Sequence, residues 1–382
     1  MLQSLVKIQL PYLKLHHILT SSVWQMSKNI MRLIQVGALA FIILQLVHCK
    51  TETGAASNSD EYDTESGELC VHSLGSRKKH FYERIPGAKF IGKAVKSLVS
   101  TPKENVSFYL YKRDFPTCAQ EIRIDDDSLH NSAFDTRHPT RIIINGWMSS
   151  SRNPFIKSVS SAYFSLGDFN IIVVDWSSMS SSINYYKVVK LIDKVGGRVA
   201  DFAKHLHKTF QLDFDEMYLI GHSLGAQIAG SAGKQIHPDK FNTIFALDPA
   251  GPSFKEKGIE GRLDSSDAKY VESIQTSENM GFPEPLGHAT FYPNKGTYQN
   301  CMGYGCSHRR AYKYFAESIN STVGFWGVLC DREQMKKGDC PEGLNQYKMG
   351  GEPSTPKVGI FYVKTNNNSP YARGKSDSYL YA

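Results

Sequence analysis

Apolar residues along this chain form two kinds of pattern. Short runs with an unbroken apolar core are typical of strands buried in a parallel sheet, and they occur at 142–144, 169–176, 217–220 and 243–247. Between these runs, residues 153–164 and 185–210 carry apolar side chains at helical spacing, which predicts helices with one core-facing side. The alternation of strands and helices predicts an α/β fold with a doubly wound, mostly parallel sheet and helices on both faces.

Weaker patterns lie on either side of this central region. Residues 90–100 can form a short amphipathic helix, 106–112 resembles an edge strand, 311–319 is helical in pattern, and 358–363 is a last strand. No internal repeat, low-complexity tract or linker divides residues 70–382, so we expect one domain there.

The first 49 residues have the pattern of a signal peptide region. Lys28 and Arg32 precede fifteen mostly apolar residues at 33–47, which fits a secretory signal and is short for a membrane span. The mature chain is therefore expected to be secreted and to have no transmembrane span. Residues 1–25 are interpreted as an upstream extension or an alternative start, and an unusually long signal is the other interpretation.

Charge and composition narrow the class of protein. Residues 50–69 are polar and acidic, as in a flexible lead-in. The formal net charge of the 382 residues is +7, but the first 49 contain four basic residues and no acidic one. Without them the balance is 40 basic against 37 acidic residues, which does not support a nucleic-acid partner.

Cysteine usage agrees with an oxidising compartment. Of seven cysteines, Cys49 lies at the edge of the signal region, which leaves an even set of six. Sequence proximity favours the disulfides Cys301–Cys306 and Cys330–Cys340 and, by elimination, Cys70–Cys118. A zinc site that uses Cys306 and His308 is the competing interpretation, but no second closely spaced pair of ligands completes it.

Glycosylation sequons point to the same compartment. They occur at Asn105 and Asn320, whereas a third at Asn367 is weakened by the proline that follows it. We therefore expect glycans at the first two positions.

The stretch 217–233, MYLIGHSLGAQIAGSAG, carries the clearest chemistry. It predicts a strand, a tight turn displaying Ser223, and a helix of small residues. Gly221 and Gly225 relieve the crowding between strand and helix at such a turn. The helix N-terminus offers amide donors to an oxyanion that forms near the serine.

A serine hydroxyl needs a histidine base and an acid that orients it, in the chain order Ser, Asp or Glu, His for an α/β-hydrolase. Asp248 follows the strand at 243–247, and the next residue, a proline, leaves its carboxylate at the rim of the sheet. Two histidines are candidates for the base. His308 in a loop beside a predicted disulfide is preferred, and His288 is interpreted as a satisfied polar residue.

A second turn, Asn145-Gly146-Trp147, ends the strand at 142–144. Hydrolases of this fold take one oxyanion donor from such a turn and another from the residue after the nucleophile. The candidate donors are the amides of Trp147 and Leu224.

These stretches resemble the pancreatic lipase family, which includes neutral lipases, phospholipases A1 and insect lipase-like proteins. The similarity runs from about Cys70 to near Gly374 and covers TRIIINGW, NIIVVDWS, YLIGHSLGAQIAGSAGK, ALDPAGPSF, RLDSSDAKYVESIQT, GHATFYPNKGTYQ and CSHRRAYKYFAESI. The resemblance implies an α/β-hydrolase fold, a triad of Ser223, Asp248 and His308, and an oxyanion hole formed by the amides of Trp147 and Leu224.

The sequence departs from the family at several positions. Asn145, Gln227 and Gln275 stand where histidines are common, and the sequence leaves their effect on activity open. The family's lid is a loop between two cysteines, but Cys301 and Cys306 enclose only four residues, too few for a covering helix. A lid this short is similar to that of phospholipase A1 members and some insect lipases and implies an open site with little interfacial activation.

The resemblance implies a secreted serine carboxylic ester hydrolase that acts on lipids, without a metal or organic cofactor. No C-terminal β-sandwich is expected, and with it no colipase-like partner. The alternative is a catalytically weak or silent lipid-binding protein of the yolk type on the same scaffold. Yolk proteins resembling this family have lost the serine, whereas this chain keeps all three candidate residues. The sequence leaves open whether the substrate is a phospholipid, a triglyceride or a galactolipid. It also leaves the oligomeric state open.

Overall fold

A computed structural model describes residues 105–341 and 345–375 of the chain. The predicted signal region, lead-in, helix at 90–100 and cysteine at position 70 lie outside these residues. Within them, eleven strands form one sheet. Across the sheet the order is β10 (Gln346–Lys348), β9 (Trp326–Cys330), β11 (Gly359–Val363), β8 (Ala289–Pro293), β7 (Tyr270–Ile274), β6 (Thr243–Leu247), β5 (Met217–His222), β3 (Thr140–Ile144), β4 (Asn170–Asp175), β1 (Ser107–Lys112) and β2 (Phe115–Ile122).

The central strands are parallel and the flanking strands are antiparallel. Every neighbouring pair from β4 across to β11 is parallel, whereas β1, β2, β9 and β10 pair antiparallel. The predicted α/β fold with a mostly parallel sheet is therefore confirmed. The expectation that 106–112 is the edge strand is wrong, because β2 pairs with the outer side of β1.

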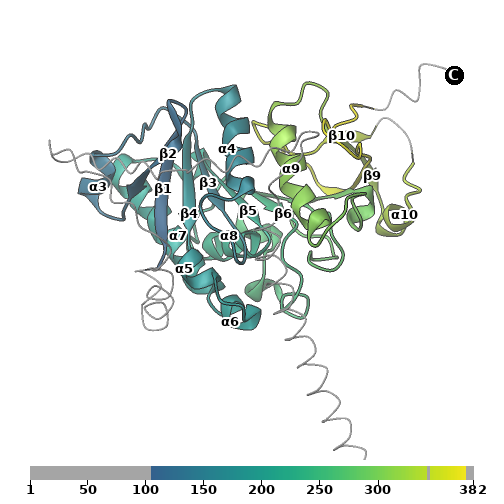
Figure 1. The fold of residues 1–382 in the computed structure, drawn as a ribbon, viewed down its shortest axis with the longest axis horizontal. Coiled ribbons are helices and arrows are strands. Elements are labelled where there is room, and N and C mark those ends of the chain that lie inside the picture. The colour runs from purple at the N-terminus through teal and green to yellow at the C-terminus, as the bar shows by residue number, and fades with distance from the viewer. Residues whose placement is uncertain (1–104, 342–344, 376–382) are drawn as a thin grey trace, which may run out of the picture. The chain divides into compact units, whose positions relative to one another are not determined.

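Helices cover both faces of the sheet (Figure 1). The α-helices are α3 (Asp126–His130), α4 (Pro154–Leu166), α5 (Ser177–Ser180), α6 (Tyr185–Val189), α7 (Ile192–Phe210), α8 (Leu224–Gln235), α9 (Cys306–Asn320) and α10 (Arg332–Lys337). Short 3-10 turns occupy Phe214–Glu216, Ile259–Gly261, Ser265–Asp267 and Asn294–Gly296.

Strand alternation divides the core into two layers. Ile142 and Ile144 of β3 pack in the cluster that contains α7 and α8, whereas Ile143 packs in the cluster that contains α4 and α9. Successive strand side chains point to opposite faces, so both layers need apolar residues. This explains why the central strands read as unbroken apolar runs.

Two helix boundaries differ from the sequence prediction. The helix expected over 185–210 is two helices, because the amide of Leu191 bonds to the carbonyl of Val188 (2.9 Å) in a tight turn that keeps the apolar spacing. The helix expected over 311–319 begins at Cys306 instead. Both corrections concern turns that hydrophobic periodicity does not register.

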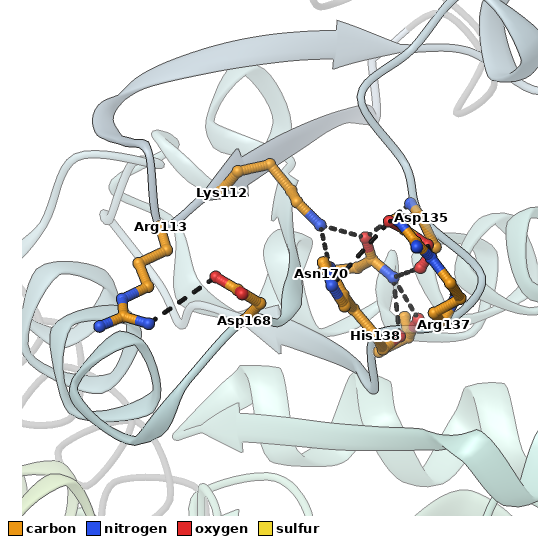
Figure 2. Close-up of polar contacts among 8 residues, drawn as sticks. Lys112, Arg113, Asp135, Arg137, His138, Asp168 and Asn170 are labelled. Carbon is orange, nitrogen blue, oxygen red and sulfur yellow. Dashed lines mark hydrogen bonds and ion pairs between the residues drawn. The ribbon is translucent and has the colours of Figure 1, made fainter.

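The amino-terminal edge of the sheet is fixed by a polar cluster around Asn170 (Figure 2). Its amide nitrogen donates to the carbonyls of Asp135 (2.8 Å) and His138 (2.9 Å), and its oxygen accepts from Lys112 Nζ (2.9 Å). Burial lowers the pKa of Lys112. The cluster holds the loop before β3 against β1 and β4, at the edge opposite the carboxyl ends of the parallel strands.

In the part of the chain that the structure describes, no helix has both the length and the apolar character needed to cross a membrane.

Candidate active site

Ser223 lies at the turn between β5 and α8. Its backbone has φ 59° and ψ −122°, and its amide donates to the carbonyl of Leu247 (3.0 Å). A Cβ added at Gly221 would lie 2.4 Å from the carbonyl oxygen of Gly225, and one added at Gly225 would lie 2.0 Å from that of Ile144. The two glycines therefore allow the close approach of strand and helix that displays a partly exposed serine.

Asp248 and His308 are hydrogen-bonded although sixty positions separate them. The distance from His308 Nδ1 to Asp248 Oδ2 is 2.5 Å, and both side chains are buried. Asp248 directly follows β6 with φ 42°, and the carbonyl of Ser223 accepts from the amide of Ala250 in the same loop (3.1 Å). The structure therefore brings the three predicted catalytic residues to one edge of the sheet.

The placement of His308 in a loop was wrong. It lies in the first turn of α9, which begins at Cys306 directly after the capping residue Gly305 (φ 67°). The disulfide Cys301–Cys306 joins this first turn to the preceding loop. Since the disulfide uses the thiol of Cys306, the alternative zinc site is also wrong.

The Asp248 carboxylate has further donors that the sequence did not indicate. Its Oδ1 accepts from the amides of Thr276 (2.7 Å) and Ser277 (3.0 Å), and its Oδ2 accepts from the Ser277 hydroxyl as well as from His308. These donors stabilise a fully buried carboxylate and fix its orientation toward the imidazole. Ser277 follows β7, and only the spatial neighbourhood of β6 and β7 reveals its role.

His222 connects the serine turn to α9. Its Nε2 lies 3.1 Å from the carbonyl oxygen of His308, and the two rings lie 4.4 Å apart. Phe155 and Tyr312 also pack on the His222 ring. A carbonyl only accepts, so Nε2 carries a proton. Burial first, and then the charge of His308, holds the pKa of His222 well below its ordinary value, so the ring is neutral.

The turn at Asn145-Gly146-Trp147 faces Ser223. A Cβ on Gly146 would lie 2.8 Å from Ser223 Cβ and 3.3 Å from its Oγ. The Trp147 indole donates to the carbonyl of Ser182 (2.8 Å), and this fixes the residue at the site's rim. Leu224 is the first residue of α8, so its amide has no intrahelical acceptor and points out of the helix end.

Three residues that depart from the family pattern are buried near the site. Gln227 donates to the carbonyl of Ala250 (2.9 Å) and accepts from the amide of Leu263 (2.8 Å), which ties down the loop after Asp248. Gln275 donates to the carbonyl of Glu284 (2.9 Å). The side-chain amide of Asn145 has no hydrogen-bond partner among the described residues.

The remaining predicted positions are His288, two further cysteine pairs and the two glycosylation sequons. His288 accepts from the amide of Val271 (3.0 Å), and burial lowers its pKa, as expected of a satisfied polar residue. The disulfide Cys330–Cys340 encloses α10. Cys118 is buried in β2, and its pairing with Cys70 stays a prediction because Cys70 lies outside the described residues. Asn105 and Asn320 stay predicted glycosylation sites.

The chain is similar to known proteins along most of its length. The model of the family "Lipase" matches residues 68–371. The chain is 34% identical over 249 residues to a phospholipase A1 from Vespa velutina, spanning 61% of this chain and 82% of that protein. It is 31% identical over 344 residues to pancreatic triacylglycerol lipase from Homo sapiens, spanning 80% of this chain and 72% of that protein. Among solved structures it is similar to MGS-M1, an alpha/beta hydrolase enzyme from a deep-sea metagenome, with TM-score 0.27 and 14% identity, covering 40% of this chain and 59% of that one.

Proposed function

The chain belongs to the lipase family and is a carboxylic ester hydrolase that acts on lipids, and we propose that Ser223, His308 and Asp248 are its catalytic triad. The observation that carries the proposal is the buried hydrogen bond between His308 and Asp248 beside the strained turn of Ser223. A positioned imidazole of this kind makes a serine hydroxyl nucleophilic.

The proposed reaction proceeds through an acyl-enzyme. Ser223 Oγ attacks the ester carbonyl and transfers its proton to His308 Nε2, while the amides of Trp147 and Leu224 stabilise the oxyanion. His308 then protonates the leaving alcohol. In the second half, His308 takes a proton from water, the hydroxide attacks the acyl carbonyl, and the fatty acid leaves with Ser223 reprotonated. Asp248 keeps the Nδ1 proton on His308 throughout.

A fluorophosphonate probe tests this proposal. Labelling should occur on Ser223, and Ser223→Ala should abolish both labelling and hydrolysis of a soluble short-chain ester. Normal turnover by the alanine variant would refute the triad. Wild-type protein that neither labels nor turns over would favour the lipid-binding, yolk-type alternative.

The disulfide loop supports a phospholipase A1 substrate preference. Only four residues lie between Cys301 and Cys306, and Met302 and Tyr304 among them are exposed. We propose hydrolysis at the sn-1 position of phospholipids, because so short a loop leaves the serine open without a covering helix. Fatty-acid release from phosphatidylcholine, triolein and galactolipid distinguishes the substrates, and fastest release from triolein would contradict this assignment.

Secretion is likewise proposed, and with it action outside the cell. The apolar segment at 33–47 and the two disulfides support it. N-terminal sequencing of protein from the culture medium checks this: mature protein that retains 33–47 would refute it.

A further inference from the structure

The segment that contains α5 and α6 projects beyond the sheet at the edge where the parallel strands end (Figure 1). It follows β4, whose carboxyl end points the same way as that of β5 and therefore toward Ser223. Ile183 and Tyr186 in this segment are 71% and 73% exposed. Large apolar side chains with such exposure on one loop indicate a contact surface.

The segment is joined directly to the candidate oxyanion turn. Met148, 55% exposed, donates its amide to the carbonyl of Ser180 (3.1 Å), and the indole of Trp147 donates to Ser182. The rings of Trp147 and Tyr185 lie edge to face at 5.2 Å. Met148 therefore lies beside the α5–α6 segment, and the exposed apolar side chains belong to one region at the rim of the site.

The exposed charges within and just after α6 are positive. Lys187 and Lys190 are exposed there, no acidic residue occurs from 176 to 192, and the next acidic residue, Asp193, accepts from the Ser231 hydroxyl (3.2 Å). Val188 and Val189 are buried, so α6 turns its valines to the core and keeps Tyr186 and Lys187 outside. Exposed apolar and aromatic side chains beside lysines are the residue types that bind a lipid–water interface with anionic headgroups.

We propose that Met148, Ile183, Tyr186, Lys187 and Lys190 form a docking surface for lipid surfaces that carry anionic headgroups. The apolar side chains enter the interface, and the lysines contact the headgroups. The docking surface holds the opening beside Ser223 against the lipid without a covering lid. This inference rests on the proposed function for its biological meaning, but binding to lipid can be measured without turnover.

Binding is tested with the full chain carrying Ser223→Ala, so that the lipid stays intact during sedimentation. The vesicles are phosphatidylcholine alone, and phosphatidylcholine partly replaced by phosphatidylglycerol. Replacing both Lys187 and Lys190 by glutamine should weaken binding to the anionic vesicles about 25-fold, since each lysine near an anionic surface is worth about fivefold. Replacing Ile183 and Tyr186 by serine should weaken binding to both kinds of vesicle at least tenfold.

Matched controls come from the opposite edge. Lys208 at the end of α7 and Leu166 at the end of α4 are also exposed, and Lys208→Gln and Leu166→Ser should bind vesicles like the parent. Equal binding to both vesicles by the parent, or equal losses from the control variants, would overturn the proposal. A dimer that dissociates on the Ile183 and Tyr186 replacements, with vesicle binding unchanged, would overturn it by assigning the surface to a second copy of the chain.

Turnover separates this proposal from the proposed function. With Ser223 restored, the docking-surface variants should hydrolyse vesicle phospholipid at least tenfold more slowly, relative to a soluble short-chain ester, than wild type does. If wild type does not hydrolyse the soluble ester, the proposed function is refuted. The vesicle-binding results still test the docking surface in that case. If both rates change in parallel, the docking surface is refuted and the hydrolase stands.

Discussion

His222 should contribute to the pH dependence of this protein's stability, and His222→Gln should remove that contribution. The His222 ring is packed between the serine turn and α9, with Nε2 donating to the carbonyl of His308. Burial and the charges of His308 and Arg309 hold its pKa well below 6.5. Glutamine can donate the same hydrogen bond but does not titrate.

The sign follows from which state takes up the proton. Well above pH 6.5, His222 is neutral in both the folded and the unfolded chain. Below that pH the unfolded chain binds a proton that the folded chain resists, so stability falls until the pH reaches the folded pKa. The slope approaches 1.36 kcal/mol per pH unit, so wild type should lose about 1.4 kcal/mol by about pH 5.5 that the glutamine variant keeps.

Urea unfolding of the oxidised full chain at several pH values measures this difference. The free energy of unfolding of wild type minus that of His222→Gln should fall by about 1.4 kcal/mol from about pH 7.5 to about pH 5.5. His237→Gln, at an exposed histidine, serves as the control for histidine replacement itself. A difference between wild type and His222→Gln that stays constant with pH would show that His222 protonates equally in both states and refute the reasoning.

Three further predictions concern residues around the fold and site. Ser277→Ala removes the hydroxyl donor to Asp248 and should lower kcat on a soluble ester about ten- to a hundredfold with KM unchanged. Ser277→Thr keeps a hydroxyl and should restore most of the rate. An unaltered kcat in the alanine variant would contradict the assigned role. Gly225→Ala places a Cβ 2.0 Å from a backbone oxygen and should destabilise the protein by about 3 kcal/mol or more in thermal unfolding. The control Gly167→Ala has open space around the added Cβ, and its stability should lie within about 1 kcal/mol of wild type. Asn170→Ala removes three hydrogen bonds from the cluster of Figure 2 and should lower the free energy of urea unfolding by about 2–4 kcal/mol. A near-neutral result would show that water replaces the lost bonds.

Short stretches of neighbouring residues were enough to predict the central strands and the serine turn. Each central strand is covered on both faces, so its residues are apolar without alternation and can be recognised from a short window. The turn at Ser223 could be predicted because the crowding that requires glycine at positions 221 and 225 arises within five residues. The position of Asp248 could also be predicted locally, because it directly follows the last residue of β6 and therefore lies at the rim of the sheet.

Tertiary structure decided the features that depend on distant partners. Ser277 and the orientation of His222 acquire their roles only because β7 and α9 pack beside β6 and β5, and nothing in their local sequence marks them. The break before α7 and the early start of α9 depend on tight turns and a left-handed Gly305 that leave the apolar spacing unchanged. Sequence therefore predicted the candidate triad, because crowding and burial act locally. The fold decided what holds these residues in place, because those contacts join segments far apart along the chain.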